Sequence, residues 1–252
     1  MQHIVCLVIP CYNEAYMLPQ LRENYLSFLD DSTDVILCFV NDGSKDNTLN
    51  ILEDLKKSAP NKIEILSYND NQGKAEAVLR GMVHCNEKFE HNYIGYLDAD
   101  LATSLSEAMR VKNILVNNPE LSFVFGSRIA KLGSTIERSY FRFFVGRIIA
   151  TIISKILALP VYDTQCGCKV FRKETSQKLF VEPFISKWLF DVELFFRMYQ
   201  AYGKQEAIKK MKEIPLDAWI DPGDSKVSFT YFFKLWFDLR RINKEYKKIN
   251  KN

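Results

Sequence analysis

The chain has 252 residues, of which 47% are hydrophobic and 26% are charged, the proportions of an ordinary globular protein. This length fits one large domain, or one domain with a C-terminal extension. The formal net charge of +3 is too small to indicate a nucleic-acid partner.

Cysteine and histidine usage argues against disulfides and zinc. The six cysteines form no C-x-x-C pair, so we expect small buried thiols in a reducing compartment. The three histidines have no metal-ligand spacing. No signal peptide is recognisable, and the longest stretch without a charged residue, 1–13, is shorter than the ~18 apolar residues of a membrane span. We therefore expect a cytoplasmic protein.

Strand and helix signals alternate in the first half of the chain. Short apolar runs predict strands, and hydrophobic residues at helical spacing predict the helices between them. Strands separated in this way indicate βαβ units, and hence an α/β protein with a mostly parallel sheet flanked by helices. In chain order the predictions are strand 3–9, helix 14–29, strand 34–40, helix 47–58, strand 62–68, helix 74–85 and strand 93–97.

The pattern changes after residue 121. A strand at 121–125 is followed by a turn, and the apolar stretch 139–159 is interrupted by basic residues. Helical spacing recurs at 187–199 and at 228–248, where the second segment begins with aromatic residues. Its C-terminal part is strongly basic and carries Arg240, Arg241, Lys244, Lys247, Lys248 and Lys251 against Glu245 alone.

Polar clusters follow three of the predicted strands, at 10–14, 41–44 and 98–100. Ligands of open parallel sheets bind beyond the carboxyl ends of the strands, where these clusters would converge. The alternative is that all three are only turns, because turn residues are common after strands.

Asp98 and Asp100 are the most informative pair. Two carboxylates one residue apart at a strand end repel each other unless a cation offsets their charge. Their hard oxygen atoms suit Mg²⁺ or Mn²⁺ that also binds a diphosphate. The chain has neither a G-x-G-x-x-G after the first strand nor a P-loop, which argues against a dinucleotide dehydrogenase and a P-loop NTPase.

Three motifs in this order resemble those of family-2 glycosyltransferases. They are VIPCYNE (8–14), VNDGSKDNT (40–48) and LDAD (97–100). Later motifs are similar to those of dolichyl-phosphate glucosyltransferases and their bacterial polyprenyl-phosphate relatives. They are GSR (126–128), DTQCGCK (163–169), WLFDVEL (188–194) and DSK (224–226). Two positions depart from the pattern, since Asn41 replaces the usual first Asp and Cys168 replaces Phe.

The resemblance implies a GT-A fold, a Rossmann-like nucleotide-diphospho-sugar transferase with C-terminal amphipathic helices. It implies a catalytic domain at 1–226, in which 139–159 is an interfacial or acceptor-side helix, and a basic amphipathic helix at 227–252. The two amphipathic segments would lie peripherally at the cytoplasmic face of a membrane. Alternatively they pack against the domain itself, a membrane-protein partner or a second copy of the chain.

The resemblance also assigns site residues. The residues that would contact the nucleotide are Pro10, Tyr12, Glu14, Val40 and Asp42, of which Asp42 would hold the base or ribose. The residues that would contact the metal and the diphosphate are Asp98, Ala99 and Asp100. Phosphate charge would be offset by Arg128 and Lys226. The sugar and acceptor pocket would be shaped by Asp163, Gln165 and Lys169.

The implied reaction transfers a hexose, with inversion, from a UDP-sugar to a polyprenyl phosphate, and the expected hexose is glucose. Such a phosphate arrives ionised, whereas a hydroxyl acceptor needs a general base, for which Asp191 is the best candidate. Alternatives are a family-2 enzyme that extends a surface polysaccharide and a non-catalytic nucleotide-sugar-binding subunit.

Several of these side chains also have plain structural interpretations, because charged residues are mostly surface groups. Arg128 could be an exposed charge at a strand end, and Lys226 a solvated loop lysine. Asp191 and Glu193 could equally form the polar face of their helix.

Overall fold

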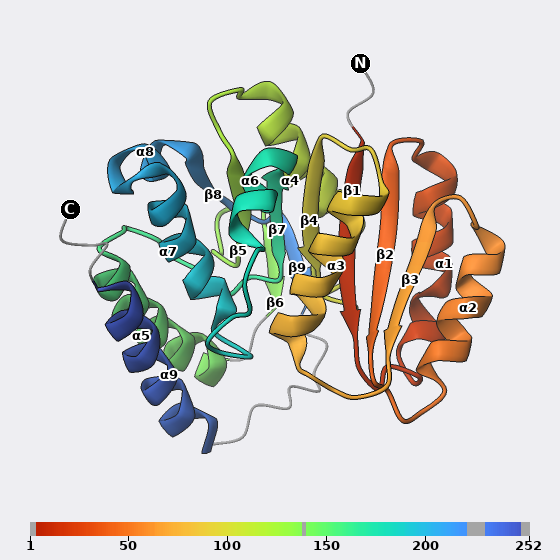
Figure 1. Cartoon of the computed structure of the whole chain (residues 1–252), viewed down its shortest axis with the longest axis horizontal. Helices are drawn as coiled ribbons and strands as arrows, with labels where there is room; N and C mark the ends of the chain where they lie inside the picture. The colour runs from red at the N-terminus through yellow and green to blue at the C-terminus, as the bar shows by residue number, and fades with distance from the viewer. Residues whose placement is uncertain (1–3, 138–139, 221–229, 248–252) are drawn as a thin grey trace.

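The computed structural model describes residues 4–137, 140–220 and 230–247. Its centre is a seven-stranded sheet with the strand order β3-β2-β1-β4-β7-β5-β8, and a two-stranded sheet pairs β6 with β9 (Figure 1). The strands are β1 (Val5–Cys11), β2 (Val35–Asp42), β3 (Ile63–Tyr68), β4 (Tyr93–Leu97), β5 (Phe123–Ser127), β6 (Thr135–Glu137), β7 (Cys168–Arg172), β8 (Met211–Pro215) and β9 (Ala218–Ile220).

The large sheet is parallel except for one strand. β1 pairs in parallel with β2 and β4, β2 with β3, and β5 with β8, whereas β7 is antiparallel to both β4 and β5. The chain therefore enters β7 at the edge where the other strands end, the lower edge in Figure 1. This reversal brings the loop before Cys168 to the carboxyl end of β4.

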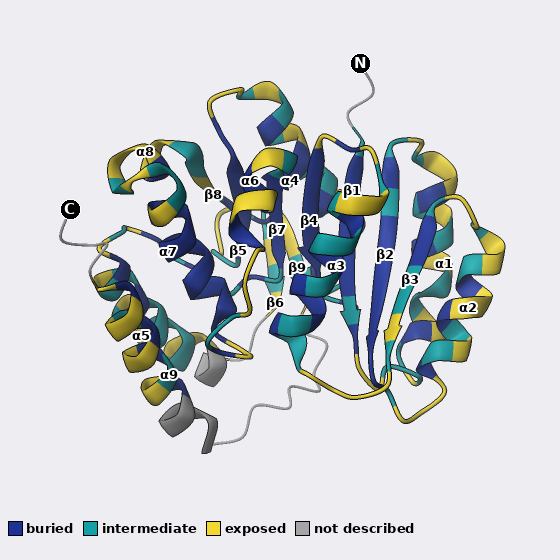
Figure 2. Ribbon diagram, viewed as in Figure 1, coloured by how far each residue is buried: buried dark blue, intermediate teal, exposed yellow. Residues whose placement is uncertain are grey.

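Helices cover both faces of the sheet. They are α1 (Leu18–Asp31), α2 (Thr48–Ser58), α3 (Lys74–Lys88), α4 (Leu105–Asn117), α5 (Tyr140–Leu157), α6 (Lys173–Leu179), α7 (Phe190–Tyr202), α8 (Lys204–Lys210) and α9 (Thr230–Tyr246). Buried residues of α1, α2 and α4 cluster with Val5, Leu7 and Ile9 on one face, and those of α3 and α7 with Cys6 and Val8 on the other. Both faces of β1 are thus buried, as Figure 2 shows for the central strands.

α5 and α9 pack against α7 with one side each. Ile153 and Leu157 of α5 and Leu239 of α9 belong to the same buried cluster as α7. The ring of Tyr246 stacks on Phe196, with ring centroids 5.0 Å apart. Their other sides expose large hydrophobic residues, namely Phe143, Phe144, Ile148, Trp236 and Phe237.

Within the described residues, no helix combines the length and the apolar character needed to cross a membrane. All six cysteines are free and buried, as expected. The predicted helices and strands of the first half are confirmed, but their ends shift.

Helix α1 begins at Leu18, so the expected start at residue 14 is wrong. The backbone N–H of Glu14 donates to Thr48 Oγ1 and that of Ala15 to Asp46 Oδ2, which holds this segment in a turn. Pro19 then lies in the first helical turn, where its missing N–H is tolerated.

Candidate active site

The polar clusters at the ends of β1 and β2 interlock. The backbone N–H of Asn13 donates to Ser44 Oγ at 3.0 Å, and that of Lys45 donates to Asn13 Oδ1 at 2.9 Å. β4 lies on the other side of β1, so the Asp98–Asp100 segment emerges beside them. The expected convergence is confirmed.

Asp42 organises the loop before α3. Its side chain is 3% exposed, and its two oxygens accept the backbone N–H groups of Gln72 at 2.9 Å and Gly73 at 2.7 Å. Because each carboxylate oxygen has two lone pairs, acceptor capacity remains for a ligand. Of the other residues assigned to the nucleotide, Tyr12 is 40% exposed, whereas Val40 is fully buried, its main chain included.

Asp98 and Asp100 differ in environment. Lys74 Nζ lies 2.5 Å from Asp98 Oδ1, whereas Asp100 Oδ1 accepts the backbone N–H of Ala102 at 2.9 Å. Burial, and next the negative charge of Asp98, raise the pKa of Asp100 above its usual value. Gly167 packs directly on Asp98, since a Cβ at this position would lie 2.1 Å from Asp98 Oδ2.

Asp98 and Asp100 fit a divalent cation whose coordination is completed by a bound ligand. Within residues 4–137, 140–220 and 230–247, no group of three or more His, Cys, Asp or Glu side chains is arranged to hold a metal ion. Mg²⁺ and Mn²⁺ are commonly held by one or two carboxylates together with substrate phosphates and water. The pair at the end of β4 has that composition.

Arg128 forms a bidentate ion pair with Asp163. Its Nε lies 2.7 Å from Asp163 Oδ2 and its second guanidinium nitrogen 2.9 Å from Oδ1, and the side chains are only 18% and 11% exposed. Burial acts against both charges, but their mutual attraction outweighs it, raising the pKa of Arg128 and lowering that of Asp163. The interpretation of Arg128 as an exposed strand-end charge is wrong.

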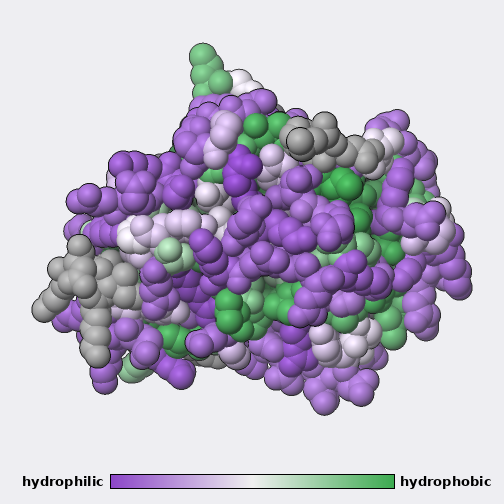
Figure 3. Space-filling model, turned by 45° about the horizontal axis from the view of Figure 1, so that its top comes forward, coloured by the Kyte–Doolittle hydropathy of each residue, from purple (hydrophilic) through white to green (hydrophobic). Residues whose placement is uncertain are grey.

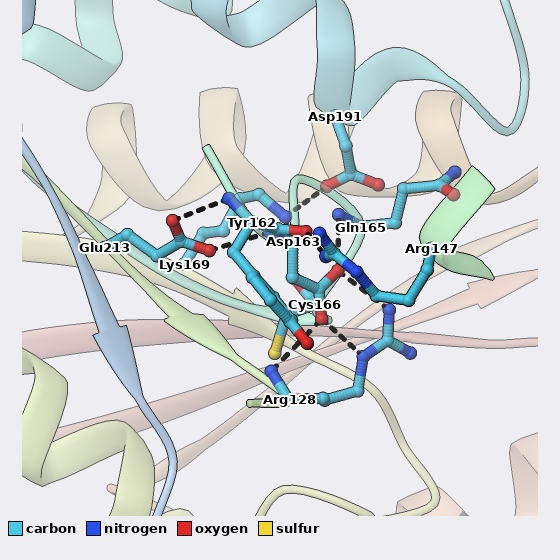
Figure 4. A network of polar contacts seen from close by, with 9 residues as sticks. All are labelled: Arg128, Arg147, Tyr162, Asp163, Gln165, Cys166, Lys169, Asp191 and Glu213. Atoms are coloured by element: carbon cyan, nitrogen blue, oxygen red, sulfur yellow. Dashed lines mark hydrogen bonds and ion pairs between the residues drawn. The ribbon is translucent and has the colours of Figure 1, made fainter. Parts of the chain in front are cut away.

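Glu213 of β8 holds the loop that carries Asp163. Its two oxygens accept the backbone N–H groups of Tyr162 at 2.8 Å and Asp163 at 2.7 Å. Figure 4 shows this chain of contacts from Glu213 through Asp163 to Arg128. The orientation of the guanidinium therefore depends on a strand far away in the sequence.

Lys169 lies beneath the same loop. Its side chain is fully buried, and its Nζ lies 2.6 Å from both the carbonyl oxygen of Cys166 and Asp191 Oδ1. Tyr96 donates its hydroxyl to the same oxygen of Asp191. Lys169 thus contacts the loop that lines the pocket through the backbone carbonyl of Cys166.

Asp191 and Glu193 do not face solvent. They are 5% and 0% exposed, and Glu193 accepts the backbone N–H groups of Ile185 and Ser186. The interpretation that they form a polar helix face is wrong. Asp191 would have to act through its second carboxylate oxygen if it served as a base.

A small pocket that opens to solvent lies between the loop and α5. Arg147 of α5 stacks on Tyr162, with the guanidinium carbon 3.5 Å from the ring centroid, and donates to the carbonyl oxygen of Tyr162 at 2.8 Å. Thr164 Oγ1 is buried and has no hydrogen-bond partner in the part of the chain that the structure describes. The lining residues are Arg128, Gly146, Arg147, Ala150, Ile153, Tyr162, Asp163, Thr164 and Gln165.

Most of the predicted site residues meet at this edge, but Lys226 lies outside the described residues. Three contributors were not predicted, namely Lys74, Arg147 and Glu213. Lys74 had a usable signal, because it follows the third predicted strand and thus belongs to the same edge. Glu213 had none, since its role depends on the pairing of β8 with β5.

The chain is similar to several known proteins. The family profile described as glycosyl transferase family 2 matches residues 6–180. A dolichyl-phosphate beta-glucosyltransferase of Dictyostelium discoideum is 30% identical over 95% of this chain and 74% of its own length. The human protein of that name is 28% identical over 86% of this chain and 72% of its own.

Among solved structures, mannosyl-3-phosphoglycerate synthase from Rubrobacter xylanophilus superposes with a TM-score of 0.71 at 15% identity, covering 95% of this chain and 72% of that chain. Glucosyl-3-phosphoglycerate synthase from Mycobacterium tuberculosis, in complex with Mn²⁺, UDP-glucose and phosphoglyceric acid, gives 0.69 at 14% identity, covering 97% and 79%. These similarities confirm the expected GT-A fold.

Proposed function

The chain belongs to glycosyl transferase family 2, and on this premise we propose that it transfers glucose, with inversion, from UDP-glucose to a polyprenyl phosphate. Two relatives that match most of the chain are named dolichyl-phosphate beta-glucosyltransferase, which supports both the sugar and the class of acceptor.

The observation that carries this proposal is the cationic pocket beside the carboxylate pair. Arg128 and Arg147 line it together with Thr164, whose buried hydroxyl has no hydrogen-bond partner among the described residues. A guanidinium has five N–H donors, so Arg128 keeps donors beyond the two that bind Asp163. Such a pocket suits a phosphate monoester better than a neutral sugar hydroxyl.

The chemistry follows from the charge of the acceptor. A phosphate monoester has a second pKa near ~6 and is largely dianionic at pH 7, so its oxygen needs no general base. Asp191, whose Oδ1 is bound by Lys169 and Tyr96, would then position the loop rather than accept a proton. Arg128, and Lys226 in the undescribed segment, would offset phosphate charge.

The donor would lie across the ends of β1, β2 and β4. Asp98 and Asp100 would hold Mg²⁺ or Mn²⁺, which offsets charge on the leaving diphosphate when bound. Asp42 would contact the base or ribose while fixing Gln72 and Gly73. The complex of a fold relative with Mn²⁺ and UDP-glucose supports this choice of metal and donor.

The acceptor tail requires a membrane nearby. We propose peripheral attachment at the cytoplasmic face, through the exposed aromatic side chains of α5 and α9. Residues 1–226 would then form the catalytic domain and 227–252 the basic helix. The alternative to test is that a membrane-protein partner or a second copy of the chain covers these aromatic side chains.

The test is a transfer assay with a panel of UDP- and GDP-sugars and Mn²⁺, in which either a polyprenyl phosphate or an oligosaccharide is the acceptor and the product is identified by mass. We expect a glucosylated lipid from UDP-glucose. Transfer only to a saccharide would instead show a polysaccharide-extending enzyme. Absence of UDP release with every acceptor would indicate a non-catalytic subunit.

A further inference from the structure

Lys74 lies among the acidic residues of the strand ends. Its Nζ is 2.5 Å from Asp98 Oδ1, and its side chain is 28% exposed. The negative charges of Asp191 and Asp100 also act on Lys74. An ammonium group thus occupies one side of the carboxylate to which the proposed function assigns a divalent cation.

The backbone that presents Lys74 is held from two directions. Asp42 accepts the N–H groups of Gln72 and Gly73, and the N–H of Ala75 donates to the carbonyl oxygen of Lys187 at 3.3 Å. Gly73 has φ of +98°, a value that favours glycine. With the start of α3 fixed in this way, only the flexible side chain of Lys74 can change its partner.

Two anions suit this side chain. Lys74 is the first residue of α3, where the helix dipole favours an anion and disfavours a cation. Asp98 offsets that repulsion in the structure described here. A diphosphate in front of α3 would be attracted by both the helix end and the ammonium group.

We propose that Lys74 is the counter-ion of Asp98 in the absence of donor, and that its ammonium group moves to the donor diphosphate when a divalent cation binds Asp98. This inference rests on the proposed function. It gives Lys74 opposite effects on two affinities, since it competes with a cation that arrives alone and assists a nucleotide that arrives with one. The protein would therefore bind its metal together with the donor.

The experiment compares Lys74→Met with Lys88→Met. Lys88 is the matched control, because it ends the same helix and its Nζ pairs with Glu64 at 2.6 Å. Electron paramagnetic resonance measures Mn²⁺ affinity without nucleotide, and calorimetry measures UDP affinity at saturating Mn²⁺. For Lys74→Met we expect Mn²⁺ to bind about fivefold more tightly and UDP about tenfold more weakly, with both unchanged in Lys88→Met.

The opposite signs distinguish this role from a structural one. A Lys74→Met protein that binds both Mn²⁺ and UDP more weakly, or binds Mn²⁺ as the wild type does, would overturn the inference. Lys74→Arg keeps the charge and should keep the weak Mn²⁺ binding of the wild type. Wild-type protein that binds no Mn²⁺ even with UDP would overturn the metal assignment of the proposed function itself.

Discussion

The ion pair between Arg128 and Asp163 links stability to the site. A buried carboxylate is stable only when an opposite charge and hydrogen bonds compensate for its lost hydration. Asp163 has the positive charge and two hydrogen bonds of the Arg128 guanidinium, and it also accepts the backbone N–H of Gln165. The same contacts fix the guanidinium at the pocket. Each partner therefore has a structural and a functional consequence.

Replacing Asp163 by Asn should lower the free energy of unfolding by about 3 kcal/mol at pH 7, because it leaves Arg128 buried without a counter-charge. The pKa of Asp163 is depressed, so its stabilisation is fully present above the ordinary carboxyl pKa of about 3.9 and is lost as the pH falls below it. Urea unfolding at pH 7 and at lower pH should show that the free energy of unfolding falls more steeply with pH for the wild type than for Asp163→Asn. Exposed Asp30→Asn is the control, and parallel pH profiles for wild type and Asp163→Asn would contradict the assignment.

A second prediction concerns the carboxylate pair. Asp98→Asn and Asp100→Asn should each reduce transfer by about 100-fold or more, since each removes charge that holds the cation at the leaving diphosphate. A chelator should have the same effect on the wild type, and excess Mn²⁺ should reverse it. Thermal unfolding serves as the control for folding. Full activity of either variant in chelator would exclude the metal assignment.

At the scale of secondary-structure elements, β7 and β8 complete the site. β7 runs against its neighbours and so carries the 163–167 loop to the ends of the parallel strands. β8 supplies Glu213, which holds two successive N–H groups of that loop. The proposed donor side is built from consecutive βα units, whereas the proposed acceptor side depends on pairing between distant segments.

Glu213→Gln should therefore separate the two sides. Glutamine offers one acceptor oxygen where two N–H groups need one each, so the loop should lose its fixed geometry. We expect kcat/KM for the lipid phosphate to fall about tenfold, or about 1.4 kcal/mol in transition-state stabilisation, with UDP affinity unchanged. Lys212→Gln changes the exposed neighbour on β8 and should leave both unchanged. Equal loss of both affinities would show general destabilisation instead.

The same division explains what the sequence could predict. β1 to β4 and their helices follow from local hydrophobic periodicity, and the convergence of 10–14, 41–44 and 98–100 follows from parallel pairing. β7 has no comparable local signal, because its five residues Cys168–Arg172 become a strand through pairing with β4 and β5. Arg147 and Glu213 were missed because their common partner Tyr162 lies close to them only after folding.

At the scale of the whole molecule, surface character varies with position. The face in Figure 3 is mostly hydrophilic, with hydrophobic residues in small separate patches. Exposed aromatic side chains occur on α5, which lines the pocket, and on α9, and both helices appear at the lower left in Figure 1. Arg240 of α9 lies over the Trp236 ring, 4.8 Å from its centroid, so cationic and aromatic groups are interleaved.

This arrangement predicts membrane binding with two separable parts. Exposed Arg240, Arg241 and Lys244 should each contribute on the order of 1 kcal/mol near an anionic surface, an attraction screened over about 8 Å at physiological salt. Exposed Phe143 and Phe144 of α5 should add insertion energy that salt does not weaken. Flotation with vesicles should therefore require anionic lipid and should decrease, without vanishing, as salt rises.

Surface variants test the two parts without disturbing the core. Deleting α9 would uncover Phe196, on which Tyr246 stacks, so substitutions are cleaner than truncation. Replacing the three basic residues by Gln should remove the requirement for anionic lipid, whereas Phe143→Ser with Phe144→Ser should reduce the salt-resistant fraction. Lys209→Gln, on exposed α8 at the opposite edge in Figure 1, is the control. If wild-type protein does not float with anionic vesicles at low salt, these helix faces cover a partner or a second copy instead, and a saccharide acceptor becomes the better hypothesis.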